Sequence, residues 1–275
     1  MKEKNRLITQ ILLEYHGFDV SKYDDTFLNK TFRKRITQTL CNTTEEYYTL
    51  LKGKNKEGEI FFDSLNICYS HFFRNPLTFA VLERIILPEL CLKTRYSKQK
   101  EIRVWSAACA AGQETYSLAM LLEELKNSDN EKINFRIFAT DQSEIIINEA
   151  IEGRYSYNDL NNVNLKRVKQ WFTKDGDAYT VNKELKKNIV FSVFDLLSDE
   201  FSCPPASIFG DFDLVICANL LFYYKPVYQK KILEKTGNSL TTDGFLITGE
   251  TERHILTRYN FSEVFPQSAI FNIGN

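Results

Sequence analysis

The sequence has 275 residues, of which 43% are hydrophobic and 13% aromatic, and its formal net charge is -1. This length and composition allow one large domain with its own core and a smaller second domain. The balanced charge gives the whole molecule no electrostatic reason to coat nucleic acid or an anionic membrane. The start, Met1–Arg6, lacks the apolar run of a secretory signal, and the longest apolar stretch, Asp213–Tyr224, is too short to cross a bilayer. We therefore expect a cytoplasmic protein without membrane insertion.

The six cysteines indicate reduced, mostly buried thiols rather than a metal site. The sequence has no Cys-x-x-Cys pair, and only three histidines are available to complete a ligand set. Free thiols are among the side chains most often buried. We therefore expect no bound metal. The cysteines are Cys41, Cys68, Cys91, Cys109, Cys203 and Cys217.

The first part of the chain, from Asn5 to about Phe79, has a helical pattern because its apolar residues recur at spacings of three and four. A connecting helix at Phe79–Leu92 follows Pro76, whose fixed φ suits a helix start, and Thr94–Lys100 forms a polar break. We expect an all-helical domain at 1–80, a linking helix and linker at 81–98, and a second, larger domain at 99–275. The apolar residues with this spacing are Leu7, Ile8, Ile11 and Leu12, and then Phe32, Ile36 and Leu40.

Apolar segments alternate with helical segments after this break, which predicts an α/β fold with a mostly parallel sheet. The predicted strands are short and apolar on consecutive residues, as expected when helices cover both faces of a sheet. The strands are Ile102–Ala107, Phe135–Thr140, Ile189–Phe194, Leu214–Cys217 and Phe245–Thr248, and the helices are Thr115–Leu125, Glu144–Ile151 and Val227–Leu240.

Two segments depart from this alternation. Between Tyr155 and Ile189, the turn-like Asp175–Asp177 precedes the β-prone Tyr179–Val181. We therefore predict a small β subdomain at about 165–190. The tail, Tyr259–Gly274, carries alternating apolar residues around a proline, which predicts a closing antiparallel hairpin.

Ligands of open α/β sheets bind beyond the carboxyl ends of the strands, so the residues just after each strand are the candidates for a site. The first strand continues into Ala107–Glu114, a run of small residues that lets a ligand approach the backbone before a helix begins. The glycine patterns of dinucleotide-binding and phosphate-binding loops are absent, which disfavours a pyrophosphate cofactor. Alternatively, these alanines only allow the strand and helix to pack tightly.

Polar residues also follow the other predicted strands. Asp141 can accept both ribose hydroxyl protons, and Asp195 can accept from an adenine amino group while Leu196 packs on the ring. Cys217–Asn219 and Phe222–Tyr224 follow the fourth strand. Each of these residue types also has a purely structural explanation. An aspartate can cap a helix, an asparagine can form a turn, and a tyrosine can belong to the core.

The combination of these motifs resembles the CheR chemoreceptor methyltransferases, in order and spacing through most of the chain. A Phe-Phe-Arg element outside the sheet and an Asn-x-x-x-Tyr element inside it have no common structural reason to occur together, so the resemblance is specific. It implies a Rossmann-like methyltransferase sheet with S-adenosyl-L-methionine as cofactor and S-adenosyl-L-homocysteine as product. The matching segments are Ser70–Arg74, Trp105–Tyr116, Ala139–Asp141, the spacing of Ala150, Gly153 and Tyr155, Asp195–Leu197, Cys217–Asn219 with Tyr223, and Asp243–Gly244 ahead of Gly249–Glu252.

The resemblance also implies a role for individual residues. Glu114 would face the amino group of the cofactor, Asp141 its ribose, and Asp195 with Leu196 its adenine. Asn219 would lie near the sulfonium, and Ser70 and Arg74 would approach from the side of the helical domain. The full cofactor-binding set implied by the resemblance is Ser70, Arg74, Ala107, Glu114, Asp141, Asp195, Leu196, Ala218 and Asn219.

The implied reaction is O-methylation of glutamate side chains on the cytoplasmic helical region of a chemoreceptor, which forms glutamate methyl esters. A glutamate carboxylate is already ionised near neutral pH, with a free pKa of about 4.3, so no general base is required. Arg74, a planar donor fork, and Tyr223 would be the catalytic residues that orient the reacting groups. The alternative role for Arg74 is an interdomain salt bridge.

A basic cluster in the helical domain is a candidate docking surface for the substrate. Its cations would point outward while Phe32, Ile36 and Leu40 face inward. A solvated face is the usual role of such a cluster, but the resemblance favours docking of acidic receptor helices. Nucleic acid is disfavoured because aromatic residues are not interleaved with the cations. The cluster is Lys30, Arg33, Lys34 and Arg35.

Several positions depart from the family pattern and leave alternatives open. The family usually has Arg at Ala218, Asn at Cys68, Glu at Gln113, Pro at Thr115 and Asn at Asp195. Loss of the arginine keeps open a regulatory module that binds S-adenosylmethionine or S-adenosylhomocysteine without turnover. A nicotinamide-dependent dehydrogenase would share the sheet but lacks the glycine fingerprint. The loop Lys174–Ala178 is short, so we expect recognition without a pentapeptide tether, by a monomer.

Overall fold

The structure, a computed structural model, describes residues 2–53, 56–65, 70–96, 100–128, 134–207 and 209–273. Cys68 and the end of the predicted hairpin at Gly274 lie outside these ranges. Packing divides the chain into two compact units. The helical unit comprises Met1–Ile67 and Leu221–Gln229, and the sheet unit comprises Cys68–Leu220 and Lys230–Asn275. No helix within the described ranges is both long and apolar enough to span a membrane.

Capped helices form the N-terminal part of the helical unit. Asp24 accepts from the backbone N–H groups of Thr26 and Phe27, and the Thr43 hydroxyl accepts from that of Glu46. These caps satisfy N–H groups that have no partner inside a helix. The helices are α1 (Lys2–His16), α2 (Asp25–Gln38), α3 (Thr44–Lys52) and α4 (Glu57–Asp63). Their core includes Ile8, Ile11, Leu12, Leu28, Phe32, Tyr47, Leu51 and Phe61.

Leu40 departs from the predicted inward face of α2. It is 85% exposed, with a φ of 57°, whereas Phe32 is buried and Ile36 half-buried. The prediction that Leu40 faces inward is therefore wrong. The helix ends at Gln38, and beyond that residue the helical periodicity no longer decides which way a side chain points.

A segment far along the chain completes the helical unit. The 3-10 turn η3 (Leu221–Tyr223) leads into a bridge between Tyr224 and Tyr23, whose rings stack with 5.3 Å between their centroids. The backbone N–H of Asp24 donates to the carbonyl of Tyr223 (2.8 Å). Tyr223 is therefore fixed at the start of α2.

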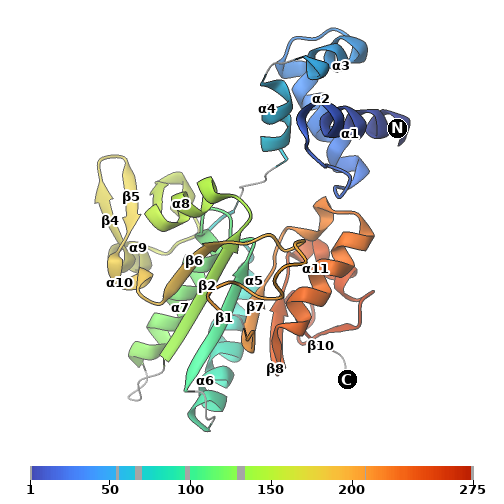
Figure 1. The fold of residues 1–275 in the computed structure, drawn as a ribbon. Helices are drawn as coiled ribbons and strands as arrows, with labels where there is room; N and C mark the ends of the chain where they lie inside the picture. Colours follow the sequence, from blue (N-terminus) through green and yellow to red (C-terminus); the bar gives the residue numbers. More distant parts are fainter. Residues whose placement is uncertain are drawn as a thin grey trace. The chain divides into compact units, whose positions relative to one another are not determined.

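A seven-stranded sheet in the order β6-β2-β1-β7-β8-β10-β9 is the centre of the sheet unit (Figure 1). Its first five strands are parallel neighbours, and β10 runs antiparallel to β8 and β9. This arrangement confirms the predicted α/β class, with a mostly parallel sheet and a closing antiparallel hairpin. The strands are β1 (Glu101–Ala107), β2 (Asn134–Asp141), β6 (Ile189–Val193), β7 (Phe212–Ile216), β8 (Leu240–Ile247), β9 (Phe261–Glu263) and β10 (Ile270–Ile273).

Helices connect the parallel strands on both faces of the sheet. The chain passes from β1 through α7 to β2 in one direction, and from β7 through α11 to β8 in the other. Because such crossovers are right-handed, α7 and α11 lie on opposite faces. The order reverses between β1 and β7, whose carboxyl ends therefore form the place where such sheets bind ligands. The helices are α7 (Gln113–Ser128), α8 (Glu144–Glu152), α11 (Pro226–Asn238), the 3-10 turn η4 (Glu250–Glu252) and α12 (Arg253–Leu256).

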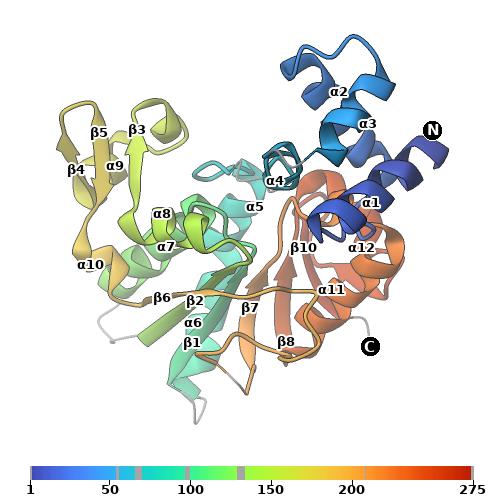
Figure 2. The same cartoon turned by 45° about the horizontal axis from the view of Figure 1, so that its top comes forward.

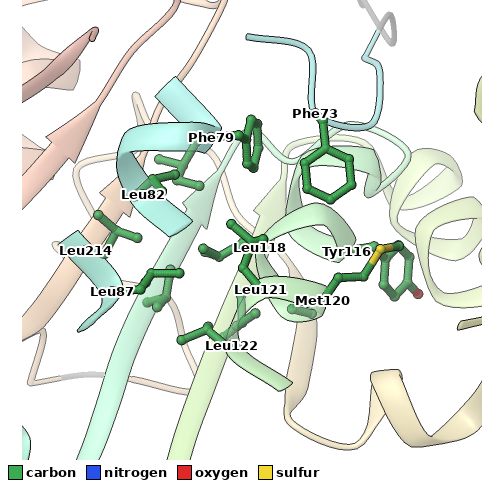
Figure 3. Packing of buried hydrophobic residues seen from close by; sticks show 14 of the residues in the cluster. Phe73, Phe79, Leu82, Leu87, Tyr116, Leu118, Met120, Leu121, Leu122 and Leu214 are labelled. Carbon is green, nitrogen blue, oxygen red and sulfur yellow. The ribbon is translucent and has the colours of Figure 1, made fainter. Parts of the chain in front are cut away.

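The α7 face of the sheet carries the main hydrophobic core of the sheet unit. Leu118 and Leu121 of α7 are buried in one cluster with Leu82 and Leu87 from the helices that precede β1 (Figure 3). The rings of Phe73 and Phe79 meet at 5.1 Å between centroids in the same cluster. The Phe-Phe-Arg element is therefore anchored by its aromatic side chains in the core that α7 shares.

The predicted connecting helix contains a local widening. Helix α5 (Pro76–Val81) continues into a π-helical turn (Leu82–Ile86) and then into α6 (Leu87–Tyr96). Pro88 is the second residue after the π turn. A proline has no N–H, and its ring would clash with the Arg84 carbonyl in a regular α-helix, so the wider turn accommodates it.

A second, three-stranded antiparallel sheet in the order β3-β5-β4 stands apart from the main sheet (Figure 2). Its hairpin turn is Gly176–Asp177, with Gly176 at a φ of 59°. The predicted β insertion is thus present, and its loop is short. The elements are β3 (Arg154–Ser156), η2 (Asn158–Leu160), α9 (Leu165–Trp171), β4 (Phe172–Asp175), β5 (Ala178–Val181) and α10 (Lys183–Lys186).

Candidate functional site

The loop after β1 is held in a strained conformation. Ala108 and Ala110 have φ angles of 55° and 48°, a region that costs a residue with a side chain about 1–2 kcal/mol. The N–H of Cys109 donates to the Thr140 carbonyl (2.8 Å), and the N–H of Ala110 donates to Oδ2 of Asp141 (3.1 Å). Strain of this kind concentrates at ligand-binding sites, so the loop is a candidate for binding.

Asp141 ends β2 directly beside this loop. The strand register pairs buried Ala107 with Thr140, so the predicted cofactor residues Ala107 and Asp141 lie at the same edge. Besides the Ala110 bond, the carboxylate accepts from the N–H of Ser143 (3.1 Å). Burial raises the pKa of Asp141, and these backbone donors partly offset that rise. The acid predicted for the ribose thus has a defined position and remaining acceptor capacity.

Glu114, in the first turn of α7, lies where charged groups converge. Burial raises the pKa of Glu114 to about 7, while Arg74 lowers it and Glu252 raises it further. Arg74 belongs to the sheet unit and not to the helical side from which it was expected. The reason is its neighbour Phe73, whose N–H donates to the Ser117 hydroxyl of α7 (3.0 Å).

Oγ of Ser70 and Oε1 of Gln113 are among the buried polar atoms that have no hydrogen-bond partner within the described part of the chain. Ser70, which is also in the sheet unit, is 8% exposed and Gln113 is 7% exposed. An unsatisfied buried polar atom is costly, which suits both atoms to a polar ligand. Ser70 was predicted as a cofactor residue, whereas no role was predicted for Gln113.

Asp195 and Leu196 follow β6, the neighbour of β2. The N–H of Phe194 donates to the Asp141 carbonyl (2.9 Å), so this segment lies next to the predicted ribose acid. Asp195 is exposed, with Oδ1 accepting from the N–H of Leu197 (2.8 Å), and Leu196 is buried. One carboxylate oxygen of Asp195 therefore already has a structural task, as expected for a turn-forming aspartate.

Ala218 and Asn219 form the turn after β7. Ala218 is half-buried against the core, and Asn219 has a left-handed φ of 60°. The N–H of Asn219 donates to Oε2 of Glu252 (2.7 Å). This turn lies at the switch point between β1 and β7, where the sulfonium end of the cofactor was predicted.

Glu252 is a site residue that sequence reasoning did not identify. Its segment Gly249–Glu252 contributed to the family resemblance, but no role was inferred for it. The available signal was the same as for Asp141: a carboxylate shortly after the end of a parallel strand, here β8. In the structure, Glu252 is fully buried and supports the Asn219 turn.

Tyr223 lies in the helical unit, where it lines a pocket of about 490 Å³ together with Lys30 and Lys34. Its ring contacts that of Phe27, with 4.8 Å between centroids. The pocket has two ammonium groups and one carboxylate, that of Asp24, which already accepts from the N–H groups of Thr26 and Phe27, so the excess of donors suits an anionic ligand. The other residues lining the pocket are Asp24, Thr26, Phe27, Thr31, Ser64 and Phe222.

The predicted docking cations do not all point to solvent. Lys30, Arg33 and Lys34 are exposed, but Arg35 is 13% exposed. Its guanidinium donates to both carboxylate oxygens of buried Glu57, at 2.9 and 2.7 Å. The expectation that Arg35 faces outward is therefore wrong, because a partner 22 residues along the chain holds it in the core of the helical unit.

The structure thus gathers the predicted residues into two groups. The sheet unit brings Arg74 and Glu114 together at the start of α7 and also contains Ser70, and it brings six further residues to one sheet edge: Ala107, Asp141, Asp195, Leu196, Ala218 and Asn219. The helical unit joins Tyr223 to Lys30 and Lys34. The pairing of Arg74 with Tyr223 involves both units and stays a prediction.

The sheet-unit residues fit S-adenosylmethionine. Glu114 and Asp141 provide carboxylate acceptors of the kind that an ammonium group and ribose hydroxyls need, and the residues of the β1 loop are small enough for close approach. Within the described residues, Ser70 and Gln113 also offer polar atoms without a hydrogen-bond partner. Among the described side chains, no cluster of His, Cys, Asp and Glu could hold a metal ion.

Comparison with known proteins agrees with this geometry. Residues 69–269 match the family described as "CheR methyltransferase, SAM binding domain". Proteins named "Chemotaxis protein methyltransferase" are similar over most of their length. The one from Listeria innocua is 30% identical over 91% of this chain and 90% of its own, and that from Escherichia coli is 26% identical over 92% and 86%. This chain therefore belongs to the CheR methyltransferase family, and its cofactor is S-adenosylmethionine.

Proposed function

We propose that this protein transfers a methyl group to glutamate side chains of a chemoreceptor-like protein and forms glutamate methyl esters. The observation that carries the proposal is the pocket that Tyr223, Lys30 and Lys34 line together, because donors of this kind favour a carboxylate. The names of the chemotaxis methyltransferase relatives support the same substrate class.

We assign the cofactor contacts to the sheet unit. Glu114 binds the ammonium group, Asp141 the ribose hydroxyls, and Asp195 with Leu196 the adenine. Ala107, Ala218 and Asn219 line the cofactor along the strand ends, and Ser70 and Arg74 contact its methionine part. The support for this assignment is the shared sheet edge, the unpaired Ser70 hydroxyl and the convergence of Arg74 on Glu114.

The bound cofactor supplies an electrophilic methyl group. The protein's own contribution is to hold the incoming carboxylate, which needs no general base because its free pKa is about 4.3. Arg74 offers a planar donor fork and Tyr223 a hydroxyl, and both orient the reacting oxygen. Catalysis then rests on positioning and on exclusion of water around the charged groups.

Substrate recognition is proposed to rest on the helical unit alone. Lys30, Arg33 and Lys34 present exposed cations to acidic receptor helices. The β4–β5 turn is only Gly176–Asp177, so we propose that no pentapeptide tether is gripped there. A pull-down with a carboxy-terminal receptor peptide tests this point, and tight binding would contradict it. We further propose a cytoplasmic monomer.

One assay tests the proposed function. The protein is incubated with labelled S-adenosylmethionine and membranes containing candidate receptors, and the product is treated with base. Base-labile label on a receptor band is expected. Cofactor binding without any ester, across a panel of receptors, would contradict the proposal and favour a regulatory module that senses the cofactor. Ala218, at a position where the family usually has arginine, is the feature that motivates this alternative.

A further inference from the structure

Glu252 is a fully buried carboxylate to which the reaction described above assigns no task. A buried charge is stable only when it is paired or hydrogen-bonded, so its partners indicate what it does. Oε2 accepts from the N–H of Asn219 (2.7 Å), from the N–H of Gly249 (2.9 Å) and from the hydroxyl of Thr248 (2.9 Å).

These bonds tie the end of β8 to the turn after β7. Asn219 has a left-handed φ of 60°, a conformation that asparagine tolerates better than most residues with a side chain, and its N–H bond to Glu252 holds it there. The space around the junction is also closed. A Cβ on Gly249 would come within 2.5 Å of Nδ2 of Asn219 and within 2.9 Å of Oε2 of Glu252. The position of Asn219 is thus set by Glu252 and by the absence of a side chain at Gly249.

The negative charge of Glu252 also affects the pKa of neighbouring groups. Burial raises the pKa of both Glu114 and Cys217, and Glu252 raises each of them further. Oε2 of Glu252 also lies 2.7 Å from the backbone nitrogen of Asn219, in the turn at which we place the sulfonium, so the carboxylate stands at that end of the site. S-adenosylmethionine carries a sulfonium cation there, whereas S-adenosylhomocysteine carries a neutral thioether.

We propose that Glu252 is a positioning residue that fixes the Asn219 turn and favours S-adenosylmethionine over S-adenosylhomocysteine through its buried charge. This inference rests on the cofactor assignment proposed above. A buried anion attracts the sulfonium of S-adenosylmethionine but not the neutral sulfur of S-adenosylhomocysteine. It therefore weakens inhibition of the enzyme by S-adenosylhomocysteine. Electrostatic attraction over several ångströms in a protein is sufficient to change the ratio of the two ligand affinities about tenfold.

Calorimetry of both ligands with the full chain tests the proposal. Glu252→Gln removes the charge and keeps the shape, and it is expected to lower the affinity ratio of S-adenosylmethionine to S-adenosylhomocysteine about tenfold. Glu250→Gln, an exposed residue of the same segment, is the matched control and should leave the ratio unchanged. An equal loss for both ligands, or no loss, would overturn the charge role.

A second variant covers the case in which Glu252→Gln fails to fold, as judged by circular dichroism. Thr248→Val removes one donor and keeps the charge, so both ligands should weaken equally, by about threefold. Unchanged affinities in that variant would overturn the positioning role. If the native chain bound neither ligand, the cofactor assignment itself would fail and the inference with it, a result distinct from a failure in the variants alone.

Discussion

The strand-end site of the sheet unit and the pocket of the helical unit hold their charged groups in different ways. At the sheet edge, backbone N–H groups hold the carboxylates of Asp141 and Glu252 in place. In the pocket, the ammonium groups of Lys30 and Lys34 lie on the exposed surface of one helix. The first arrangement suits a cofactor of fixed shape, and the second suits acidic partners that vary. Changes at the sheet edge should therefore act on cofactor affinity, and changes in the pocket on substrate capture.

The largest effect is expected at Arg35, which is an exception to this contrast. It is a cation of the helical unit, but it is mostly buried and held by hydrogen bonds, as the acids of the sheet edge are. Arg35→Ala should lower the free energy of unfolding by about 3 kcal/mol, since it leaves the buried Glu57 carboxylate without its ion pair. Urea denaturation measures the loss. Arg33→Ala, an exposed position on the same helix, should change stability by less than about 0.5 kcal/mol. Equal effects of the two substitutions would contradict the assignment of Arg35 to the core.

A substitution at Asp141 tests whether the sheet edge binds the cofactor. Asp141→Ala should weaken S-adenosylhomocysteine binding about 100-fold, because hydrogen bonds to a charged acceptor contribute about 1.5–3 kcal/mol. Calorimetry measures the affinity, and Asp177→Ala in the exposed β4–β5 turn serves as the control. Undiminished affinity in Asp141→Ala would rule out the ribose assignment.

The raised pKa of Glu114, about 7, predicts a pH dependence of cofactor binding. Below pH 7 the carboxyl holds a proton that must be released before it can attract an ammonium group, so affinity should rise about tenfold from pH 6 to pH 8. Binding of S-adenosylhomocysteine across this range measures the effect. In Glu114→Gln the slope should disappear, and a slope that persists would assign the titration to another group.

The lysines of the pocket should give the smallest effects. Lys30→Ala and Lys34→Ala should each raise the KM for the receptor substrate about threefold at low salt, and the difference should fade at high salt because exposed charges are screened. Lys166→Ala, an exposed lysine of the sheet unit, is the control. An effect independent of salt would indicate a structural role for these side chains.

The sequence allowed much of this architecture to be predicted because consecutive apolar residues reveal buried parallel strands, and strand ends reveal where ligands bind. It did not reveal features that depend on distant partners. We predicted an exposed Arg35 because helical periodicity gives no information on an ion-pair partner as distant in the sequence as Glu57. Glu252 was missed because its task depends on the conformation of Asn219. The placement of Arg74 in the sheet unit depends on packing of its neighbour Phe73, which no local pattern shows.

The division of labour between the two units is tested most directly at Tyr223. We predict that Tyr223→Phe binds S-adenosylhomocysteine as tightly as the native protein but forms methyl ester on the receptor about tenfold more slowly, since one orienting hydrogen bond is lost. Single-turnover transfer from labelled cofactor, with calorimetry on the same preparation, gives both quantities. Unchanged transfer, or a loss of cofactor affinity that accounts for the slower transfer, would contradict a substrate-orienting role for the pocket of the helical unit.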